Sequence, residues 1–448
     1  MSASVRFITL GCRVNQYETQ AMRESLAGIG IQELMHETVK LEKQRIDSKI
    51  DFVVINTCTV TNVADRENFY WIRRAKREHP AAKIVVTGCF VEKNRQELEK
   101  LPDVDLVITN REKSRIANFL TDGCGTPAAQ SRLSVKEPSY EFSPLFISHS
   151  HDRSRAYLKI QDGCNHACSF CKVVLVRGRS RSRLLDGIVD EARRLRDAGH
   201  QEVVLTGIQL GAYGLDLTPR IGLVDVIEEC SKIEGVERIR LSSIEPTDVK
   251  PELIALLRHN KKCCPHLHIP LQSGDDEILK RMNRRYSRAY YLDLVNRLKS
   301  EVCDFSLTLD VMAGFPGEDE RHFENTTKLL EELKPLKCHV FPYSRREGTK
   351  ASRFSDDVVA ALIRRRVEYL ISLSDRLGQA AAFPFVGRTM SVLAEKNKAR
   401  GRGMLMQGVT GNFLKVCFQG NKSQLGRLVS VRLLALQGPL FLGQAVAL

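Results

Sequence analysis

The sequence lacks the long apolar run that a membrane-spanning helix needs. No stretch approaches the roughly 18 to 20 apolar residues that cross a bilayer. The N-terminus reaches Cys12 and the polar residues Arg13 and Asn15 too early to form a secretory signal. We therefore predict a cytoplasmic protein that has no membrane among its partners.

The chain is also poor in acidic residues relative to basic ones. It has 68 Lys and Arg against 54 Asp and Glu, which gives a formal net charge of +14. The excess is concentrated between Phe385 and Leu448, where nine basic residues accompany the single acid Glu395. Because such a surplus attracts polyanions at physiological salt, we expect a polyanionic partner.

Disulfides are not expected, although the chain has 13 cysteines. A reducing cytosol keeps thiols reduced unless they bind metal. Cys164, Cys168 and Cys171 form a Cys-x-x-x-Cys-x-x-Cys run directly after a predicted strand. Three thiolates this close can converge on one metal centre, and three ligands to a four-iron cluster leave one iron open. We call these cysteines the loop trio.

A structural zinc site is the alternative interpretation of the loop trio. Zinc prefers four protein ligands in a closed site. His166 is the candidate for the fourth ligand, but its place inside the first loop suits that geometry poorly. An iron-sulfur cluster therefore fits the spacing better.

Alternating apolar strands and helix-like stretches predict an α/β protein. We expect a parallel sheet domain in residues 1–125, a linker in 126–152, a domain of six βα units in 153–383, and a small basic β-barrel in 384–448. Six units are fewer than the eight of a closed (β/α)8 barrel. The predicted strands are Val5–Leu10, Phe52–Asn56, Lys83–Gly88, Asp105–Asn110, Ala156–Ile160, Glu202–Thr206, Arg238–Ser242, His266–Leu271, Ser306–Met312, Lys337–Tyr343, Leu414–Phe418 and Leu428–Leu433.

Two further predictions follow from local patterns. A long amphipathic helix is expected to begin at a Ser355 cap and to run through Leu370. A second set of cysteines, Cys12, Cys58 and Cys89, follows the ends of three predicted strands. Because the carboxyl ends of parallel strands open into one crevice, these thiols can meet in space. We call them the strand-end trio; the alternative is that each is a buried apolar thiol.

The two trios stand in segments that resemble the radical S-adenosylmethionine superfamily and, within it, the methylthiotransferase family. The basic C-terminal segment resembles the TRAM domain, an RNA-binding barrel. The matching segments are Leu10-Gly-Cys12-Arg-Val-Asn-Gln-Tyr17-Glu18, Asn56-Thr-Cys58, Thr87-Gly-Cys89, Asp162-Gly-Cys164-Asn-His-Ala-Cys168-Ser-Phe-Cys171, Leu205-Thr-Gly207-Ile-Gln-Leu-Gly211, Ser242-Ser-Ile-Glu245-Pro246, His268-Ile-Pro-Leu-Gln272 and Gly314-Phe-Pro-Gly317-Glu. One departure is Lys172-Val-Val-Leu175, where the family often has an aliphatic residue followed by Ile-Pro-Tyr.

The resemblance implies a partial (β/α)6 barrel, two 4Fe-4S clusters and S-adenosylmethionine as cofactors. The loop trio would hold the cluster whose open iron chelates S-adenosylmethionine, and the strand-end trio would hold an auxiliary cluster that delivers sulfur. One S-adenosylmethionine would methylate the sulfur and a second would yield a 5′-deoxyadenosyl radical. The product implied is a methylthio group on carbon 2 of an adenine in tRNA.

The segment from Leu10 to Glu18 resembles the branch that acts on threonylcarbamoyladenosine at tRNA position 37 more than the branches for isopentenyladenosine or a ribosomal-protein aspartate. The implied partners are the tRNA anticodon stem-loop, an external electron donor and a sulfur source, and we expect a monomer. A non-catalytic iron-sulfur protein that binds RNA is the alternative from another functional class.

The resemblance also suggests contact residues. Those expected to face S-adenosylmethionine are Gly207, Gln209, Gly211, Ser243, Glu245, His268, Gln272 and Gly314. A tight turn explains Gly207 and Gly211 equally well, and a structural hydrogen bond explains His268 and Gln272 nearly as well. Residues expected to contact RNA are Arg177, Arg179, Arg183, Lys396, Lys398, Arg400 and Arg402. The seven remaining cysteines, expected to be packing residues, are Cys124, Cys230, Cys263, Cys264, Cys303, Cys338 and Cys417.

Overall fold

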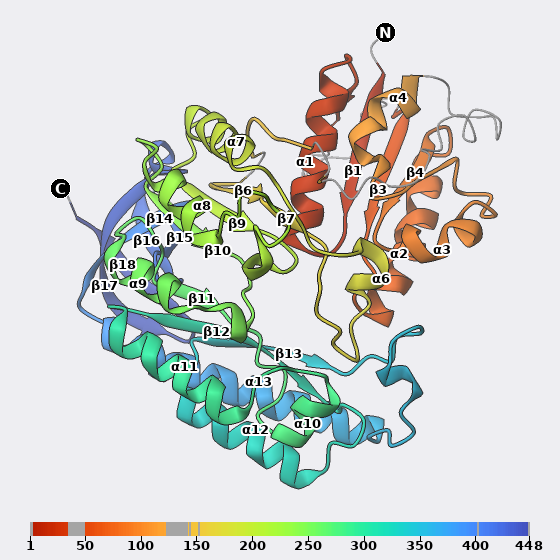
Figure 1. The fold of residues 1–448 in the computed structure, drawn as a ribbon. Coiled ribbons are helices and arrows are strands. Elements are labelled where there is room, and N and C mark those ends of the chain that lie inside the picture. Colours follow the sequence, from red (N-terminus) through yellow and green to blue (C-terminus); the bar gives the residue numbers. More distant parts are fainter. Residues whose placement is uncertain are drawn as a thin grey trace. The chain divides into compact units, whose positions relative to one another are not determined.

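The structure is a computed structural model that describes residues 3–34, 50–121, 142, 145–150, 153–400 and 403–446 (Figure 1). The chain divides into two compact units. The N-terminal unit comprises Met1–Ser148 and Lys172–Arg181, and the C-terminal unit comprises His149–Cys171 and Ser182–Leu448. Most of the predicted linker, 126–152, lies outside the described residues.

The N-terminal unit contains a five-stranded sheet with the order β2-β1-β3-β4-β5, in which every pairing is parallel. All four strands predicted for this segment are present. The strands are β1 Ser4–Thr9, β2 Gln32–Glu33, β3 Phe52–Thr57, β4 Lys83–Gly88 and β5 Leu106–Ile108. The helices are α1 Arg13–Ala27, α2 Asn62–Glu78, α3 Val91–Leu98, α4 Ile116–Thr121 and α6 Val173–Arg177.

Helices cover both faces of this sheet, which explains why its strands read as continuous apolar runs. Val54 packs in one core with Met22 of α1 and Phe119 of α4. Its neighbour Val53 faces the other way and packs with Ile72 of α2. Figure 1 shows α1 and α4 on one side of the sheet and α2 and α3 on the other. Such a three-layer arrangement leaves the carboxyl ends of the strands free to carry a site.

The C-terminal unit contains six parallel strands followed by a small barrel. Two three-stranded sheets, β10-β9-β6 and β11-β12-β13, are linked by the single bridges Ile239↔Cys263 and Ser243↔His268. This order confirms the predicted partial (β/α)6 architecture. The six strands are β6 Arg155–Lys159, β9 Glu202–Thr206, β10 Arg238–Leu241, β11 His266–His268, β12 Ser306–Ala313 and β13 Lys337–Pro342. A separate two-stranded sheet pairs β7 Gln161–Asp162 with β8 Arg181–Ser182. The helices are α7 Leu185–Asp197, α8 Leu223–Ser231, α9 Pro251–His259, α10 Asp276–Arg281, α11 Arg288–Glu301, α12 Glu320–Leu333 and α13 Ala360–Ala382.

The long predicted helix is α13, but the predicted Ser355 cap is wrong. The helix is preceded by Val359 in an extended conformation. Asp356 is held outside the helix because its carboxylate pairs with Arg281 at 2.6 Å and its carbonyl accepts the Gly317 N–H. These contacts keep the segment after Ser355 extended.

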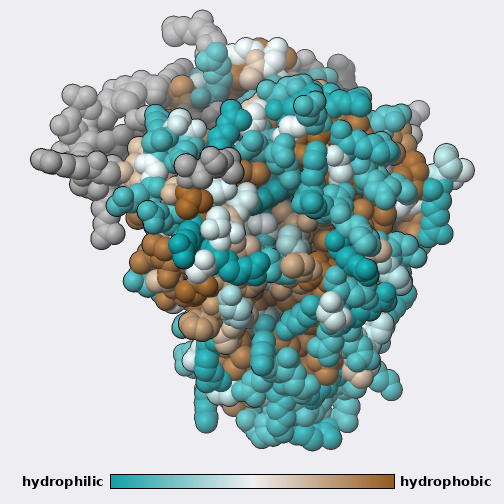
Figure 2. Space-filling view, turned by 90° about the vertical axis from the view of Figure 1, so that its left-hand side faces the viewer, coloured by the Kyte–Doolittle hydropathy of each residue, from teal (hydrophilic) through white to brown (hydrophobic). Residues whose placement is uncertain are grey.

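A closed five-stranded barrel, β14-β15-β16-β18-β17, forms the C-terminal part of this unit, as the sequence predicts. Its core includes Val392, Phe418 and Phe441. Figure 2 shows the side that carries the barrel, where hydrophilic residues dominate and smaller hydrophobic groups lie between them. No helix in the described part of the chain is both long and apolar enough to span a membrane. The barrel strands are β14 Thr389–Arg400, β15 Gly403–Thr410, β16 Lys415–Gly420, β17 Leu428–Gln437 and β18 Leu440–Ala445.

Buried arginines join this barrel to the six strands. Arg240, 1% exposed, pairs with Glu202 at 2.6 Å and donates to the carbonyls of Thr410 and Gly411 at 3.1 and 2.9 Å. Arg238 donates to the Val409 carbonyl at 3.1 Å. Removing the barrel would leave these buried cations without acceptors, so it is an integral part of the unit.

Candidate functional site: two cysteine trios

The strand-end trio lies at the carboxyl ends of three adjacent strands. Cys12 follows β1, Cys58 directly follows β3 and Cys89 directly follows β4. The register pairs Thr9 with Asn56 and Asn56 with Thr87, so the three strands end at the same level. Cys58 and Cys89 are buried and Cys12 is exposed. The fold thus places at one sheet edge three cysteines that are far apart in the sequence.

Two glycines allow the chain to pass close to these thiols. Gly11 has φ +90°, and a Cβ there would lie 2.7 Å from Cys58 Sγ. Gly88 has φ +105°, and a Cβ there would lie 2.4 Å from the Thr57 backbone. Both positions favour glycine through conformation and through space. The pairs Gly11-Cys12 and Gly88-Cys89 therefore mark positions where the backbone lies in close contact with the end of the neighbouring strand.

Burial controls the chemistry of the strand-end trio. It raises the pKa of the Cys58 thiol to about 12, and the neighbouring thiols of Cys89 and Cys12 act in the same direction. Burial also raises the pKa of Cys89, against the positive charges of Arg177 and Lys113. The mutual effect of the three thiols shows that they share one electrostatic environment. Buried cations beside them are what an anionic thiolate-bound cluster needs.

A buried network holds those cations in place. The Arg177 guanidinium donates to Cys89 Sγ at 3.2 Å, to Glu18 at 2.8 Å and to Asn15 at 2.7 Å. The Lys113 ammonium is fully buried and also pairs with Glu18. Arg177 was predicted to contact RNA, but in the structure it is 5% exposed and its donors are directed at these partners. It is not available to a phosphate.

The loop trio lies in one short segment of the C-terminal unit, from Cys164 to Cys171, just after β7. All three of its cysteines are partly exposed. The His166 N–H donates to Cys164 Sγ at 3.3 Å, and the Cys171 N–H donates to the Cys168 carbonyl at 3.1 Å. Burial raises the pKa of Cys164 to about 11, helped by the charge of Cys168. The local turn, rather than a sheet edge, holds these thiols together.

Arg284 is a neighbour of the loop trio that the sequence did not reveal. It donates to Cys168 Sγ at 3.2 Å and pairs with Glu245, a residue expected to face S-adenosylmethionine. Arg284 lies 116 residues from Cys168 in the sequence, so no local pattern joins them. Each trio thus has one arginine that donates to a cysteine sulfur.

The thiol spacing fits clusters better than single ions. In a tetrahedral zinc site with Zn–S near 2.3 Å, the sulfurs lie roughly 3.8 Å apart. Across the residues that the structure describes, neither trio brings all three sulfurs within 4.8 Å of one another. Thiolates that bind separate irons at the corners of a cube stand farther apart than the ligands of one ion. Neither trio is therefore as compact as the ligand set of a single tetrahedral ion.

Residues expected to face S-adenosylmethionine lie at the carboxyl ends of successive strands of the C-terminal unit. Gln209 follows β9 and accepts the Asn165 N–H of the cysteine loop at 2.9 Å. Ser243 follows β10 and bridges to His268. Gln272 has φ +67°, and its N–H donates to the Asp310 carbonyl at 2.8 Å. Gln209 thus contacts the cysteine loop directly, whereas Ser243 and Gln272 stand just beyond the ends of β10 and β11.

Internal packing by itself accounts for the three glycines of this set. A Cβ at Gly207 would lie 2.8 Å from Gln161 Oε1, and one at Gly211 would lie 2.1 Å from Asp248 Cβ. Gly314 has φ +77°, and a Cβ there would lie 2.4 Å from the Ile363 side chain. A cofactor contact is therefore not needed to explain glycine at these positions.

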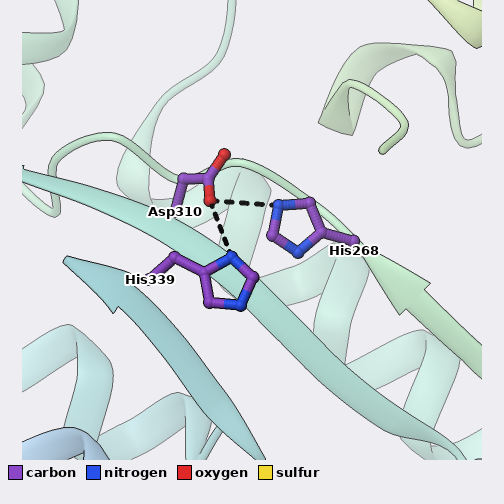
Figure 3. Close-up of side chains that lie close together, drawn as sticks. All are labelled: His268, Asp310 and His339. Atoms are coloured by element: carbon purple, nitrogen blue, oxygen red, sulfur yellow. Dashed lines mark ion pairs between the residues drawn. The ribbon is translucent and has the colours of Figure 1, made fainter. Parts of the chain in front are cut away.

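His268 belongs to a second polar group in this unit. Figure 3 shows its ring next to that of His339, with one nitrogen of each ring directed at the same oxygen of the Asp310 carboxylate. Asp310 Oδ1 lies 3.1 Å from His268 Nε2 and 3.4 Å from His339 Nδ1. Burial acts to raise the pKa of Asp310, but the two imidazoles lower it to below its ordinary value. Asp310 and His339 are not among the residues that the sequence singled out.

The residues predicted to contact RNA differ in their exposure. Arg179 and Lys396 are exposed, whereas Arg183 pairs with Glu191 at 2.7 Å. Arg402 and the side chains of Lys398 and Arg400 lie outside the described residues. Other basic residues of the barrel are exposed as well: Lys415, Lys422, Arg427 and Arg432. Exposed basic residues therefore occur across the barrel, as its predicted basic character implies, and not only among the named RNA contacts of 396–402.

Most of the remaining cysteines are packing residues, as predicted. Those that are buried are Cys230, Cys263, Cys264, Cys338 and Cys417. The prediction is wrong for Cys303, which is exposed, because it lies in the turn after α11. Cys124 lies outside the described residues.

Both cysteine regions lie within segments that match known family models. The family model described as the Radical SAM superfamily matches residues 158–330, which include the loop trio. The model described as the uncharacterized protein family UPF0004 matches residues 4–109, which include the strand-end trio. The second match lies within the N-terminal unit, and the first lies in the C-terminal unit apart from Lys172–Arg181.

Full-length relatives match across nearly the entire sequence. The threonylcarbamoyladenosine tRNA methylthiotransferase MtaB of Bacillus subtilis (strain 168) is 37% identical over 445 residues, covering 99% of this chain and 96% of the relative. The MtaB protein of Chlamydia pneumoniae is 37% identical over 438 residues, covering 97% and 96%. A tRNA-2-methylthio-N(6)-dimethylallyladenosine synthase of Natranaerobius thermophilus is 32% identical, covering 95% and 93%.

A solved structure supports the fold. The radical S-adenosylmethionine methyltransferase TsrM of Kitasatospora setae, with cobalamin and a [4Fe-4S] cluster bound, superposes with a TM-score of 0.55. The match covers 78% of this chain and 74% of that one, at 15% sequence identity. At this identity the likeness shows a shared fold.

Proposed function

The chain belongs to the radical S-adenosylmethionine methylthiotransferase family, and we propose that it adds a methylthio group to carbon 2 of threonylcarbamoyladenosine at position 37 of tRNA. As a member it is a transferase that uses S-adenosylmethionine and 4Fe-4S clusters. Three relatives whose names specify threonylcarbamoyladenosine are 33 to 37% identical over at least 95% of their own length. This likeness is the observation that carries the proposal.

We assign the two clusters to the two trios. The loop trio would hold the cluster that binds S-adenosylmethionine, and the strand-end trio would hold the auxiliary cluster. When bound, these groups supply the 5′-deoxyadenosyl radical and the sulfur. The protein contributes thiolate ligands, buried positive charge from Arg177 and Lys113 at one trio, and the Arg284 donor at the other. An external reductant and a sulfur source complete the reaction.

The exposed basic residues of the barrel are the groups that we propose for tRNA phosphates. Lys396, Lys415 and Lys422 offer charge without a fixed direction, so they would bind the backbone with little sequence reading and strong salt dependence. The modified base lies in a loop, where it can be unstacked and presented to the protein. Recognition of the base and recognition of the backbone would then rest on different residues.

Nucleoside analysis tests the substrate. We expect tRNA from cells that lack the protein to lose the methylthio derivative of threonylcarbamoyladenosine, and reintroduction of the gene to restore it. Mass spectrometry of digested tRNA measures both. Loss of the methylthio derivative of dimethylallyladenosine instead would contradict the proposed substrate, and the 32% identity to such synthases makes that the second candidate.

A reaction in purified components separates substrate from chemistry. Anaerobically reconstituted protein is supplied with reductant, S-adenosylmethionine and an anticodon stem-loop that bears either modified adenosine. We expect 5′-deoxyadenosine and methylthiolated product with the threonylcarbamoyl substrate. A non-catalytic iron-sulfur protein would give neither.

A further inference from the structure

Three neighbouring strands of the C-terminal unit bring together two imidazoles and one carboxylate. The parallel register pairs Asp310 of β12 with His339 of β13, and pairs His268 of β11 with Thr308. Thr308 stands two residues before Asp310, so its side chain points to the same face of the sheet. All three polar side chains therefore share one face, and rigid strands fix their spacing.

The spacing of these groups matches the coordination shell of one ion. Among the described residues, His268, Asp310 and His339 form the one set of three His, Cys, Asp or Glu whose ligand atoms all lie within 4.8 Å (Figure 3). Asp310 Oδ1 lies 3.1 and 3.4 Å from the two imidazole nitrogens. Neighbouring ligands of tetrahedral zinc stand roughly 3.3 to 3.6 Å apart, given metal–ligand bonds of about 2.0 to 2.2 Å.

The surroundings also suit a metal site. The other ring nitrogen of His268, Nδ1, bonds to Thr308 Oγ1 at 2.9 Å. Histidines that bind metals almost always use the second nitrogen in this way, which fixes the orientation of the ring. The His339 side chain is 48% exposed, so an ion can reach the site from solvent, while Asp310 and His268 are 22% and 13% exposed.

We infer that His268, Asp310 and His339 bind a divalent transition-metal ion such as Zn²⁺, with one coordination position left for water or another oxygen ligand. Two imidazoles and a carboxylate suit first-row transition metals, whereas Mg²⁺ and Ca²⁺ prefer oxygen ligands alone. No cysteine of either trio takes part, and the site does not depend on which tRNA base is modified. His268 would then bind the metal ion rather than contact S-adenosylmethionine.

Metal counting tests the inference. Full-length protein with both clusters assembled under anaerobic conditions, so that the cysteines are occupied, is dialysed against Zn²⁺ at defined free concentrations. Bound zinc and iron are counted by mass spectrometry of the metals. We expect one zinc per chain in addition to the cluster iron.

Three variants locate the ion. Asp310→Asn keeps the shape of the side chain and His339→Ala removes a half-exposed ring, so both spare the core. Each should weaken zinc binding by about 100-fold or more, since even changes outside the ligand set weaken it 10- to 100-fold. His259→Ala, at an exposed histidine of α9, is the matched control and should bind zinc like the unchanged protein.

Two results would overturn the site. One is that the unchanged protein takes up no zinc beyond the background of the double variant Asp310→Asn, His339→Ala. That outcome would mean that Asp310 only forms ion pairs with His268 and His339 and that the three residues bind no metal. The other is equal zinc affinity in all variants, which would place the ion elsewhere. Neither result bears on methylthio transfer, so failure here and failure of the proposed function remain distinct.

Discussion

The two cysteine trios reach similar chemistry by opposite routes. The strand-end trio is assembled by tertiary structure from the ends of β1, β3 and β4, with Cys58 and Cys89 buried. The loop trio comes from eight consecutive residues, Cys164 to Cys171, and all its thiols are partly exposed. The first site depends on the sheet and on a buried charge network, whereas the second depends on a turn. The strand-end trio should therefore be far more sensitive to changes in its unit.

Cysteine substitutions give the largest effect and test whether the trios act separately. Replacing Cys168 by alanine should abolish 5′-deoxyadenosine formation, because the cluster loses one of three ligands. Replacing Cys58 by alanine should spare 5′-deoxyadenosine and stop methylthio transfer. Both products are measured by chromatography and mass spectrometry. Cys303→Ala, at an exposed cysteine outside both trios, is the control and should change neither. If Cys58→Ala also eliminated 5′-deoxyadenosine, the division of roles would fail.

Removing one buried carboxylate should destabilise the N-terminal unit strongly. Glu18 is the partner of both Lys113 and Arg177, and its side chain is 2% exposed. Glu18→Gln leaves two buried cations without a countercharge, which should cost about 3 to 5 kcal/mol. Trp71 is the single tryptophan of the chain and lies on α2, so its fluorescence in a urea titration reports on this unit.

The matched control is an exposed pair in the same unit. Arg95 and Glu99 stand 2.7 Å apart on α3 and its C-terminal end, with side chains 39% and 37% exposed. Glu99→Gln should change the free energy of unfolding by less than about 0.5 kcal/mol. Equal midpoints for Glu18→Gln and Glu99→Gln would show that the buried network does not support the strand-end trio.

Much of the fold and of the two cysteine sites could be predicted from the sequence. The features that could not be predicted have one cause in common, which is contact between residues far apart in the chain. Each predicted strand lies within a few residues of an observed one, because apolar runs and glycines mark it locally, whereas β2, β7, β8, β14, β15 and β18 were not predicted. The loop trio is visible in its spacing, and the strand-end trio in its position after three strands. Arg284 could not be predicted, since only the folded chain brings it to Cys168.

The arginines that follow Cys171, among them Arg177 and Arg179, also show that the sequence does not reveal the tertiary partner of a charged side chain. A run of arginines in the sequence is typical of a solvated or RNA-binding surface. Arg177 is nevertheless buried, because Glu18 and Asn15 stand opposite it in the folded unit. Arg179, two residues further on, is exposed. Charge type is readable from sequence, but the partner of each charge is set by tertiary structure.

Thiol reactivity in the apoprotein should differ between the trios and depend on pH. Burial raises the pKa of Cys58 to about 12 and that of Cys164 to about 11, so both thiols stay protonated at pH 8. The thiolate fraction of Cys164 should therefore be the larger of the two at that pH. Alkylation by iodoacetamide, followed by peptide mass spectrometry, should thus label Cys164 faster, and both rates should rise with pH.

The same pKa shifts set the sign of the stability change in the apoprotein. A thiol whose pKa is higher in the folded state stabilises that state at pH below its unfolded value, and this stabilisation is lost as pH rises toward the folded value. Loss should begin above about pH 9 and extend to about 11 for Cys164 and about 12 for Cys58. Faster labelling of Cys58 than of Cys164 would contradict the difference in burial.

The smallest effect concerns the two arginines that donate to cysteine sulfur. Arg177 lies 3.2 Å from Cys89 Sγ, and Arg284 lies 3.2 Å from Cys168 Sγ. A donor beside a thiolate stabilises the more negative, reduced cluster, so Arg177→Lys and Arg284→Lys should each lower the potential of one cluster only. The shift should not exceed about 60 mV, which corresponds to a hydrogen bond of about 1.4 kcal/mol for one electron. Redox titration followed by electron paramagnetic resonance measures it. Both arginines also pair with a carboxylate, but Glu18 beside Arg177 is 2% exposed whereas Glu245 beside Arg284 is 21% exposed. Arg177→Lys should therefore reduce retention of its cluster more than Arg284→Lys does. Identical behaviour of the two variants would mean that the deeper burial of the Arg177 network adds nothing to the strand-end trio.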